Sequence, residues 1–155
     1  MRIAVGADHV AIELKQKVVE FLKEKGFEFH DFGTMSAERV DYPDFAKVVS
    51  EAVARGEYDL GILICGTGNG MSIAANKVPG IRAALCVNSF MARMSRSHNN
   101  ANVLVLGDWI VGSKLALDCV EAFIATPFSN EERHAKRVNL ISDLERQYEK
   151  GCQKQ

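Results

Sequence analysis

Short apolar runs recur along the chain, and segments of helical length with one apolar face separate them. The runs are bounded by Gly, Asn or Asp, which is typical of buried strands. The predicted strands are 3–5, 27–32, 60–65, 83–87 and 103–106. Strands that alternate with helices in this way indicate a parallel sheet.

The helical segments show a different spacing. Leu14, Val18 and Leu22 fall on one face of a helix that begins at Ile12 and stops at Gly26, where a glycine cap is expected. Further helices are predicted at 44–55, 71–77, 89–98, 111–125 and 131–148. The alternation predicts a single doubly wound, Rossmann-like α/β domain at 1–148, with a five-stranded parallel sheet, a C-terminal helix and a frayed tail at 149–155.

Ligands of such sheets bind at the carboxyl ends of the strands. Asp8 and His9 follow the first predicted strand, Cys65 ends the third and Asn88 follows the fourth. We therefore expect these residues to open onto one edge of the sheet.

The segment around Cys65 is chemically the most informative. Its strand passes directly into Gly66, Gly68 and Gly70, so backbone N–H groups can converge on an anion. A helix that begins near Met71 would add the positive end of its dipole and favour a thiolate. The same residues are also compatible with a tight turn after a buried, inert cysteine.

Three familiar glycine motifs do not match. A dinucleotide fingerprint needs an acidic residue about 20 positions further on, and 87–91 contains none. A P-loop needs a lysine directly after its last glycine, where Met71 stands. Thr67 lies out of frame for a serine nucleophile elbow. The remaining interpretation is a cysteine beside an anion-binding loop.

Composition and charge limit the classes of molecule that the protein is expected to bind. The 155 residues are 47% hydrophobic and 25% charged, as in one ordinary globular domain. A net charge of −1 without a basic stripe argues against nucleic acid and anionic membranes. The N-terminus lacks an apolar signal core, and no run approaches the roughly 18 apolar residues of a membrane helix. We expect a cytoplasmic protein that binds a small molecule.

The four cysteines are Cys65, Cys86, Cys119 and Cys152, and no two have C-x-x-C spacing. This pattern indicates reduced thiols and predicts neither a disulfide framework nor a metal site. Cys86 and Cys119 lie in apolar segments, where we expect them to be packing residues.

Six short motifs occur in order along the chain: VGADH at 5–9, DFGT at 31–34, DYPD at 41–44, ICGTG at 64–68, IAANK at 73–77 and SRSHN at 95–99. Their sequences and spacing resemble those of the B-type ribose-5-phosphate isomerases, and partly those of the galactose-6-phosphate isomerase subunits. The resemblance runs from Met1 to about Tyr148.

The resemblance implies an aldose–ketose isomerase that needs no cofactor. The Cys65 thiolate would remove the proton from C2 of an open-chain aldose phosphate and return one at C1. Another branch of the family uses a glutamate six residues later, where Met71 stands here. Preorganised N–H groups would hold the enediolate oxygen. They belong to Gly66, Gly68, Asn69 and Gly70.

The resemblance also implies a ring-opening group, His98, with Thr67 and Asp8 in support. It places Asn99 at the substrate and Tyr42 at the rim of the site. Without the resemblance, His98 reads as a helix C-terminal histidine stabilised by the dipole, and Asp8 as a cap or turn residue.

The phosphate requires cations. Arg133 and Arg137 are spaced i, i+4 on the last predicted helix and share a face, with His134 beside them and His9 near the first strand. The family places the two arginines at the phosphate across a dimer interface. A homodimer or a dimer of dimers is therefore expected.

Two departures limit the resemblance. Trp109 stands where many family members have an arginine, and Glu131-Glu132 replaces a Gly-Gly pair before Arg133. Fewer cations should weaken binding of a phosphate dianion unless the carboxylates pair with the arginines. Allose 6-phosphate, galactose 6-phosphate and tetrose phosphates therefore stay open as substrates beside ribose 5-phosphate.

Two other classes of function are alternatives. A sugar-phosphate-binding paralogue without activity would have no need for Cys65, Thr67 and His98. A thiol redox protein would need a resolving cysteine near Cys65, and the sequence has none there.

Overall fold

The structure is a computed structural model that describes residues 1–152, with side chains described for 1–148. Strands and helices alternate along most of the chain. The strands are β1 (Arg2–Ala7), β2 (Glu28–Asp31), β3 (Leu60–Cys65), β4 (Ala83–Leu85) and β5 (Val103–Gly107). The helices are α1 (Ile12–Glu24), α2 (Tyr42–Ala54), α3 (Asn69–Ala75), α4 (Ser89–Asn99), α5 (Ser113–Ala125) and α6 (Glu132–Cys152).

The five strands form one sheet in the order β2-β1-β3-β5-β4, and every neighbouring pair is parallel. All carboxyl ends therefore lie at the same edge. The uniformly apolar β3 is buried along its whole length at the centre of the sheet. The predicted doubly wound α/β fold is confirmed.

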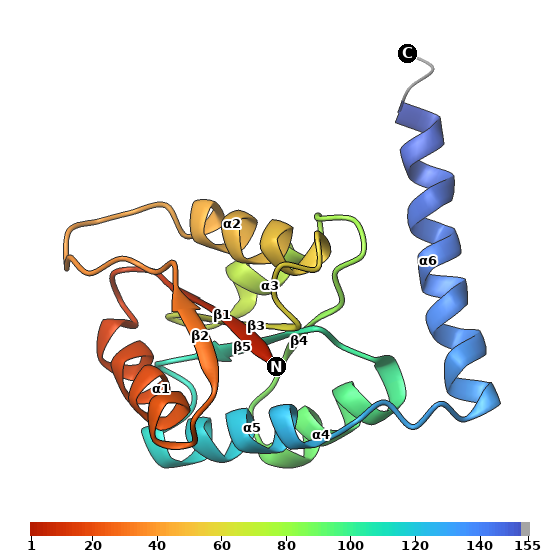
Figure 1. Cartoon of the computed structure of the whole chain (residues 1–155). Helices are drawn as coiled ribbons and strands as arrows, with labels where there is room; N and C mark the ends of the chain where they lie inside the picture. Colours follow the sequence, from red (N-terminus) through yellow and green to blue (C-terminus); the bar gives the residue numbers. More distant parts are fainter. Residues whose placement is uncertain (153–155) are drawn as a thin grey trace.

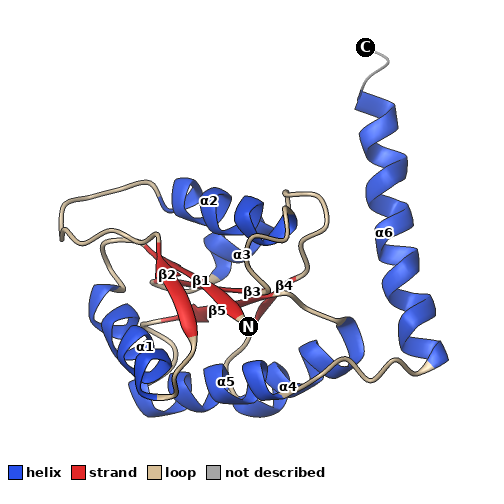
Figure 2. Cartoon of the chain, viewed as in Figure 1, coloured by secondary structure: helices blue, strands red, loops and turns tan. Residues whose placement is uncertain are grey.

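Helices cover both faces of the sheet. In Figure 1, α1, α4 and α5 lie below the sheet and α2 and α3 lie above it; Figure 2 shows the same layers by element type. Leu14, Val18 and Leu22 of α1 pack in the lower core, as their spacing predicts. Val49 and Val53 pack with β3 in the upper core. Full burial of each such side chain contributes about 1.5–3 kcal/mol.

Several predicted boundaries are wrong by a few residues. α2 begins at Tyr42, two residues early, because Pro43 fits the first turn of a helix. α3 begins at Asn69 because the left-handed Gly68 (φ 81°) ends the preceding turn. The edge strand β4 ends at Leu85. α6 continues to Cys152, beyond the domain end predicted at 148, and 153–155 lie outside the described residues.

Helix α6 stands away from the sheet at the side of the molecule where the strands begin (Figure 1). It carries large apolar side chains that are about half exposed or more, namely Leu140 (53%), Ile141 (46%), Leu144 (54%) and Tyr148 (76%). A hydrogen bond connects α6 to the rest of the domain: the Gly80 N–H donates to the Glu145 carboxylate, at 3.0 Å from Oε1 and 2.9 Å from Oε2. Among the described helices, none is long and apolar enough to cross a membrane.

Candidate active site

Cys65 lies where β3 reaches the carboxyl edge of the sheet, and it is only 5% exposed. Backbone hydrogen bonds fix the chain on both sides of it. The Asp108 N–H donates to the Cys65 carbonyl and the Trp109 N–H to the Gly66 carbonyl, both at 2.9 Å. The loop after β3 is therefore held against the loop after β5.

The glycine loop ends at the start of α3. The Asn69 N–H donates to Thr67 Oγ1 at 3.4 Å, and the first intrahelical bond runs from Ser72 N–H to the Gly68 carbonyl. The Asn69 N–H is thus engaged by Thr67, whereas the N–H groups of Gly70 and Met71 have no helical partner and are available to an anion. This loop can stabilise an oxyanion next to the thiol.

Two aromatic rings lie against the outer glycines of the loop. A Cβ on Gly66 would lie 2.9 Å from the Trp109 ring, and one on Gly70 would lie 2.6 Å from the Tyr42 ring. Trp109 is 69% exposed and Tyr42 is 40% exposed, so both rings also face solvent at the rim. Tyr42 therefore lies beside the glycine loop, and its contact with substrate stays a prediction.

Asp8 and His9 follow β1 at the same edge. Asp8 is buried, and its Oδ1 accepts the Val10 N–H at 3.1 Å, so it is a turn residue as well as a candidate site residue. His9 Nδ1 accepts the Val40 N–H at 3.3 Å. Because Nδ1 is the acceptor, the neutral ring carries its proton on Nε2.

A cavity of about 550 Å³ opens beside these residues. Its size is in the range of small-molecule sites. The lining residues are His9, Val10, Arg39, Val40, Asp41 and Trp109. Arg39 was not predicted as a site residue, because it lies in a loop without hydrophobic periodicity and only its proximity to the DYPD motif indicates it.

His98 and Asn99 do not lie at this edge within the same chain. They end α4, which runs back to the start of β5, where Val103 pairs with Gly61 near the start of β3. Cys65, by contrast, pairs with Gly107 at the end of β5. The two levels are four residues apart along the strands, or roughly 13 Å. Within one chain, the predicted base Cys65 and the predicted ring-opening group His98 therefore lie at opposite edges of the sheet.

His98 packs against His134, with ring centroids 4.2 Å apart. His134 is only 2% exposed, and its Nδ1 lies 2.8 Å from the Ser129 hydroxyl. Burial, together with the neighbouring His98 and Arg133, holds the pKa of His134 below its ordinary value. His134 was expected beside the arginines at the phosphate and is instead a buried partner of His98.

Arg133 and Arg137 lie exposed near the start of α6, on the His98 side of the molecule. Arg133 Nε lies 2.8 Å from Glu131 Oε2, and this hydrogen bond lowers the pKa of Glu131. The carboxylate that departs from the family pattern thus pairs with an arginine. In the part of the chain whose side chains are described, Arg137 has no ion-pair partner.

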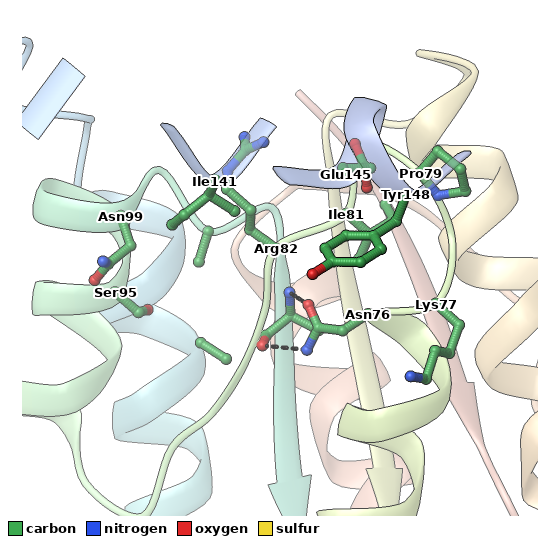
Figure 3. A pocket seen from close by; sticks show the side chains of 13 residues that line it. Asn76, Lys77, Pro79, Ile81, Arg82, Ser95, Asn99, Ile141, Glu145 and Tyr148 are labelled. Atoms are coloured by element: carbon green, nitrogen blue, oxygen red, sulfur yellow. Dashed lines mark hydrogen bonds between the residues drawn. The ribbon is translucent and has the colours of Figure 1, made fainter. Parts of the chain in front are cut away.

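A larger cavity, of about 670 Å³, lies between α6 and the segment 76–84 (Figure 3). Asn99 lines this cavity together with Ile141 and Tyr148 of α6. The Asn76 amide makes two hydrogen bonds of 2.9 Å to the Ala83 backbone, so this motif residue joins α3 to β4. Asn99 is therefore at the edge opposite to Cys65.

Cys86 and Cys119 are buried, and burial raises the pKa of each to about 11. Both are therefore neutral thiols at neutral pH, and their predicted packing role is confirmed. Cys65, Cys86 and Cys119 are all free cysteines. Within the described residues, no three His, Cys, Asp or Glu side chains are grouped to hold a metal ion.

The family model described as ribose/galactose isomerase matches residues 3–141, which is most of the chain. The chain belongs to the ribose/galactose isomerase family. The resemblance of the six motifs is thereby confirmed. In this chain, Cys65 and the glycine loop lie at the end of β3, as the sequence predicted.

Relatives in the family cover nearly the whole chain. Ribose-5-phosphate isomerase B of Escherichia coli is 49% identical over 93% of this chain and 96% of its own. The structure of the Clostridium thermocellum ribose-5-phosphate isomerase B has a TM-score of 0.93 and 56% identity, over 96% of this chain and 99% of that one. The Mycoplasma genitalium enzyme, solved with bound ribulose 5-phosphate, has a TM-score of 0.90 and 40% identity, over 94% of this chain and 96% of that one.

Proposed function

We propose that this protein is an aldose–ketose isomerase that interconverts ribose 5-phosphate and ribulose 5-phosphate. The observation that carries this conclusion is Cys65 at the end of β3, directly beside a loop whose amides have no helical partner, in a chain of this family. Relatives from three bacteria bear the name of this isomerase, and one holds the ketose product.

The reaction is a proton transfer that leaves the overall oxidation state unchanged. The Cys65 thiolate takes the proton from C2 of the open-chain aldose phosphate, and the electron pair of the C–H bond forms an enediolate. N–H groups of the glycine loop stabilise the developing oxyanion in a site that is preorganised for it. The O2 hydroxyl proton passes to O1, and Cys65 returns a proton to C1, so that C2 becomes the carbonyl carbon of the ketose. No step requires a cofactor.

A furanose must open before C2 becomes acidic, and we assign this step to His98 with Thr67 and Asp8 in support. His98 and Cys65 lie at opposite ends of the strands of one chain. We therefore propose a homodimer, alone or within a dimer of dimers, in which a second chain supplies His98, Asn99, Arg133 and Arg137. The projecting α6 with its exposed apolar side chains supports this arrangement.

The phosphate would lie between His9 of one chain and the two arginines of the other. Trp109 covers Gly66 at the position where many family members have an arginine. The free thiols of Cys65, Cys86 and Cys119 favour a reducing compartment, and we propose the cytoplasm.

Solvent isotope exchange tests the proposal. Ribose 5-phosphate is incubated with the enzyme in D₂O, and the sugars are analysed by NMR and mass spectrometry. An isomerase forms ribulose 5-phosphate with deuterium at C1, whereas a binding paralogue returns unlabelled substrate. Allose 6-phosphate, galactose 6-phosphate and a tetrose phosphate are assayed in parallel. Deuterium incorporation into one of these alone would replace ribose 5-phosphate as the substrate.

A further inference from the structure

Lys15 of α1 is among the most deeply buried side chains of the protein, with 1% exposed. Its Nζ lies 2.7 Å from Asp31 Oδ2 and donates to the Thr34 carbonyl at 2.9 Å and to Met35 Sδ at 3.4 Å. Lysine is almost never fully buried unless it is paired, because desolvating an ion pair is costly. A well-packed apolar residue would often serve stability equally well at such a place.

Two of the partners of Lys15, Asp31 and Thr34, belong to the DFGT motif, 31–34, for which the proposed reaction has no use. Asp31 Oδ1 accepts the Gly33 N–H at 2.8 Å, and the Thr34 N–H donates to the Ala7 carbonyl at 3.2 Å. Ala7 ends β1 and directly precedes Asp8. The lysine therefore holds the end of β2 against the strand end that carries Asp8 and His9.

The motif begins the loop 32–41, which contains no helix or strand and extends far from the sheet in Figure 1. The far end of the loop returns to the cavity beside Trp109, where Arg39, Val40 and Asp41 form part of the wall. There the Val40 N–H donates to His9 Nδ1. Ordering such a loop costs conformational entropy. Fixed contacts at the start of the loop reduce this cost and favour the arrangement in which its end forms the wall of the cavity.

We propose that Lys15 is a positioning residue for the substrate site. The Lys15–Asp31 ion pair fixes the start of the loop 32–41 so that its end forms one wall of the cavity and holds His9 with the proton on Nε2. That proton is then available to a phosphate oxygen, while Arg39 offers a cation at the same wall. The identity of the ligand rests on the proposed isomerase function; the loop anchoring does not.

The test compares three variants. Lys15→Met keeps an unbranched side chain that is one atom shorter, and it removes the charge. Lys15→Met/Asp31→Asn also removes the uncompensated carboxylate but keeps an acceptor for the Gly33 N–H. Lys25→Met is the matched control, because it breaks an ion pair of 2.8 Å to Glu121 that is about half exposed. If Lys15→Met alone does not fold, the double variant decides.

Three measurements are made on each variant. Amide hydrogen exchange of 33–41 should accelerate at least about tenfold in the Lys15 variants, since their loop opens more often. The ¹⁵N shifts of His9 should move from the Nε2–H tautomer towards a mixture. The KM for ribose 5-phosphate should rise about tenfold while kcat changes less than about threefold, because binding geometry is lost and the base is untouched. Lys25→Met should match the wild type in all three.

The double variant separates positioning from stability. Thermal stability close to the wild type, together with fast exchange, mixed His9 tautomers and a raised KM, supports the proposal. Wild-type exchange and tautomer in a folded double variant overturn it. If the wild type itself proves inactive on every sugar phosphate, the isomerase function fails, and the exchange and NMR measurements still decide the role of Lys15.

Discussion

The imidazole rings of His98 and His134 lie with their centroids 4.2 Å apart and their planes inclined by 33°. Two rings this close repel each other when both are protonated. His134 is the buried member, and its Nδ1 is engaged with Ser129. Burial and the neighbouring His98 therefore favour the neutral form of His134.

The lowered pKa of His134 predicts a pH-dependent stability. Well above pH 6.5, the ordinary pKa of the unfolded histidine, this residue is neutral in both the folded and the unfolded chain, and it contributes no pH dependence. As the pH falls below this value, the unfolded chain binds a proton that the folded chain excludes, so the free energy of unfolding decreases. Glu131 opposes the shift, while His98, Arg133 and Arg137 reinforce it. Urea unfolding of His134→Phe between pH 5 and pH 8 should lack this decrease; an unchanged pH profile would assign the decrease to other groups.

His98→Asn should separate ring opening from proton transfer. Turnover of ribose 5-phosphate should fall by about 10²-fold or more, the usual effect of losing an acid–base group. A tetrose phosphate cannot close a furanose through its phosphorylated C4 oxygen, so its turnover should change little. Steady-state kinetics on both substrates provide the comparison. Equal losses on both would show that His98 acts elsewhere in the cycle.

Cys65→Ala should fold normally and lose about 10² to 10⁴ of kcat, while it still binds ribose 5-phosphate by calorimetry. Cys86→Ala and Cys119→Ala are the matched controls, because burial raises the pKa of both thiols to about 11 and keeps them unreactive. Peptide mapping after iodoacetamide treatment should find Cys65 modified and protected by substrate. Near-normal turnover of Cys65→Ala would rule out the cysteine base.

Trp109→Arg should lower the KM for ribose 5-phosphate about three- to fivefold, since a partly exposed cation beside the loop strengthens phosphate binding modestly. Trp109→Phe keeps a ring against Gly66 without adding charge and should leave KM nearly unchanged. Arg137→Ala should raise KM about tenfold. If Trp109→Arg abolishes activity and another sugar phosphate is the best wild-type substrate, the tryptophan selects that sugar.

Mixed dimers should test the two-chain site. Cys65→Ala and His98→Asn chains, each inactive on ribose 5-phosphate, should regain about a quarter of wild-type activity when refolded together. Half of the dimers are then mixed, and one of the two sites in each is intact. Cys65→Ala mixed with Thr67→Ala is the control, and it should recover nothing because both lesions lie at the same edge. Absence of recovery in a verified Cys65→Ala/His98→Asn heterodimer would mean that one chain builds the whole site.

The sheet and one half of the site were predictable because their signals are local. The apolar run 60–65 predicts a strand that is buried on both faces. The polar residues that follow parallel strands lie together at the carboxyl edge of the sheet. Asp8, His9 and Cys65 were therefore placed together from the sequence, and the structure agrees.

The other half depends on topology. The place of His98 at the starting edge follows from the parallel sheet, because α4 joins β4 to the parallel β5 and must run back to the edge where β5 begins. The SRSHN motif gave His98 a role by resemblance, and its spacing alone does not show what a residue at that edge contacts. Lys15 is polar and lies on a helix, so its pattern indicates a solvated side chain rather than a buried ion pair. Arg39 and Val40 lie in a loop that hydrogen-bonds to Ala7 of β1, to His9 and to Lys15 of α1, and such contacts produce no periodic pattern in the sequence.

The thiol and the histidine lie at opposite edges of one sheet, so on the proposed two-chain site turnover would depend on the concentration of the protein. On the proposed two-chain site, a lone chain is a folded protein with no complete catalyst. Below the dissociation constant of the dimer, dilution would reduce the rate per chain as well as the total rate, in the way that mass action reduces any bound fraction. The cellular level of this chain would then set both how much enzyme is present and what fraction of it can work.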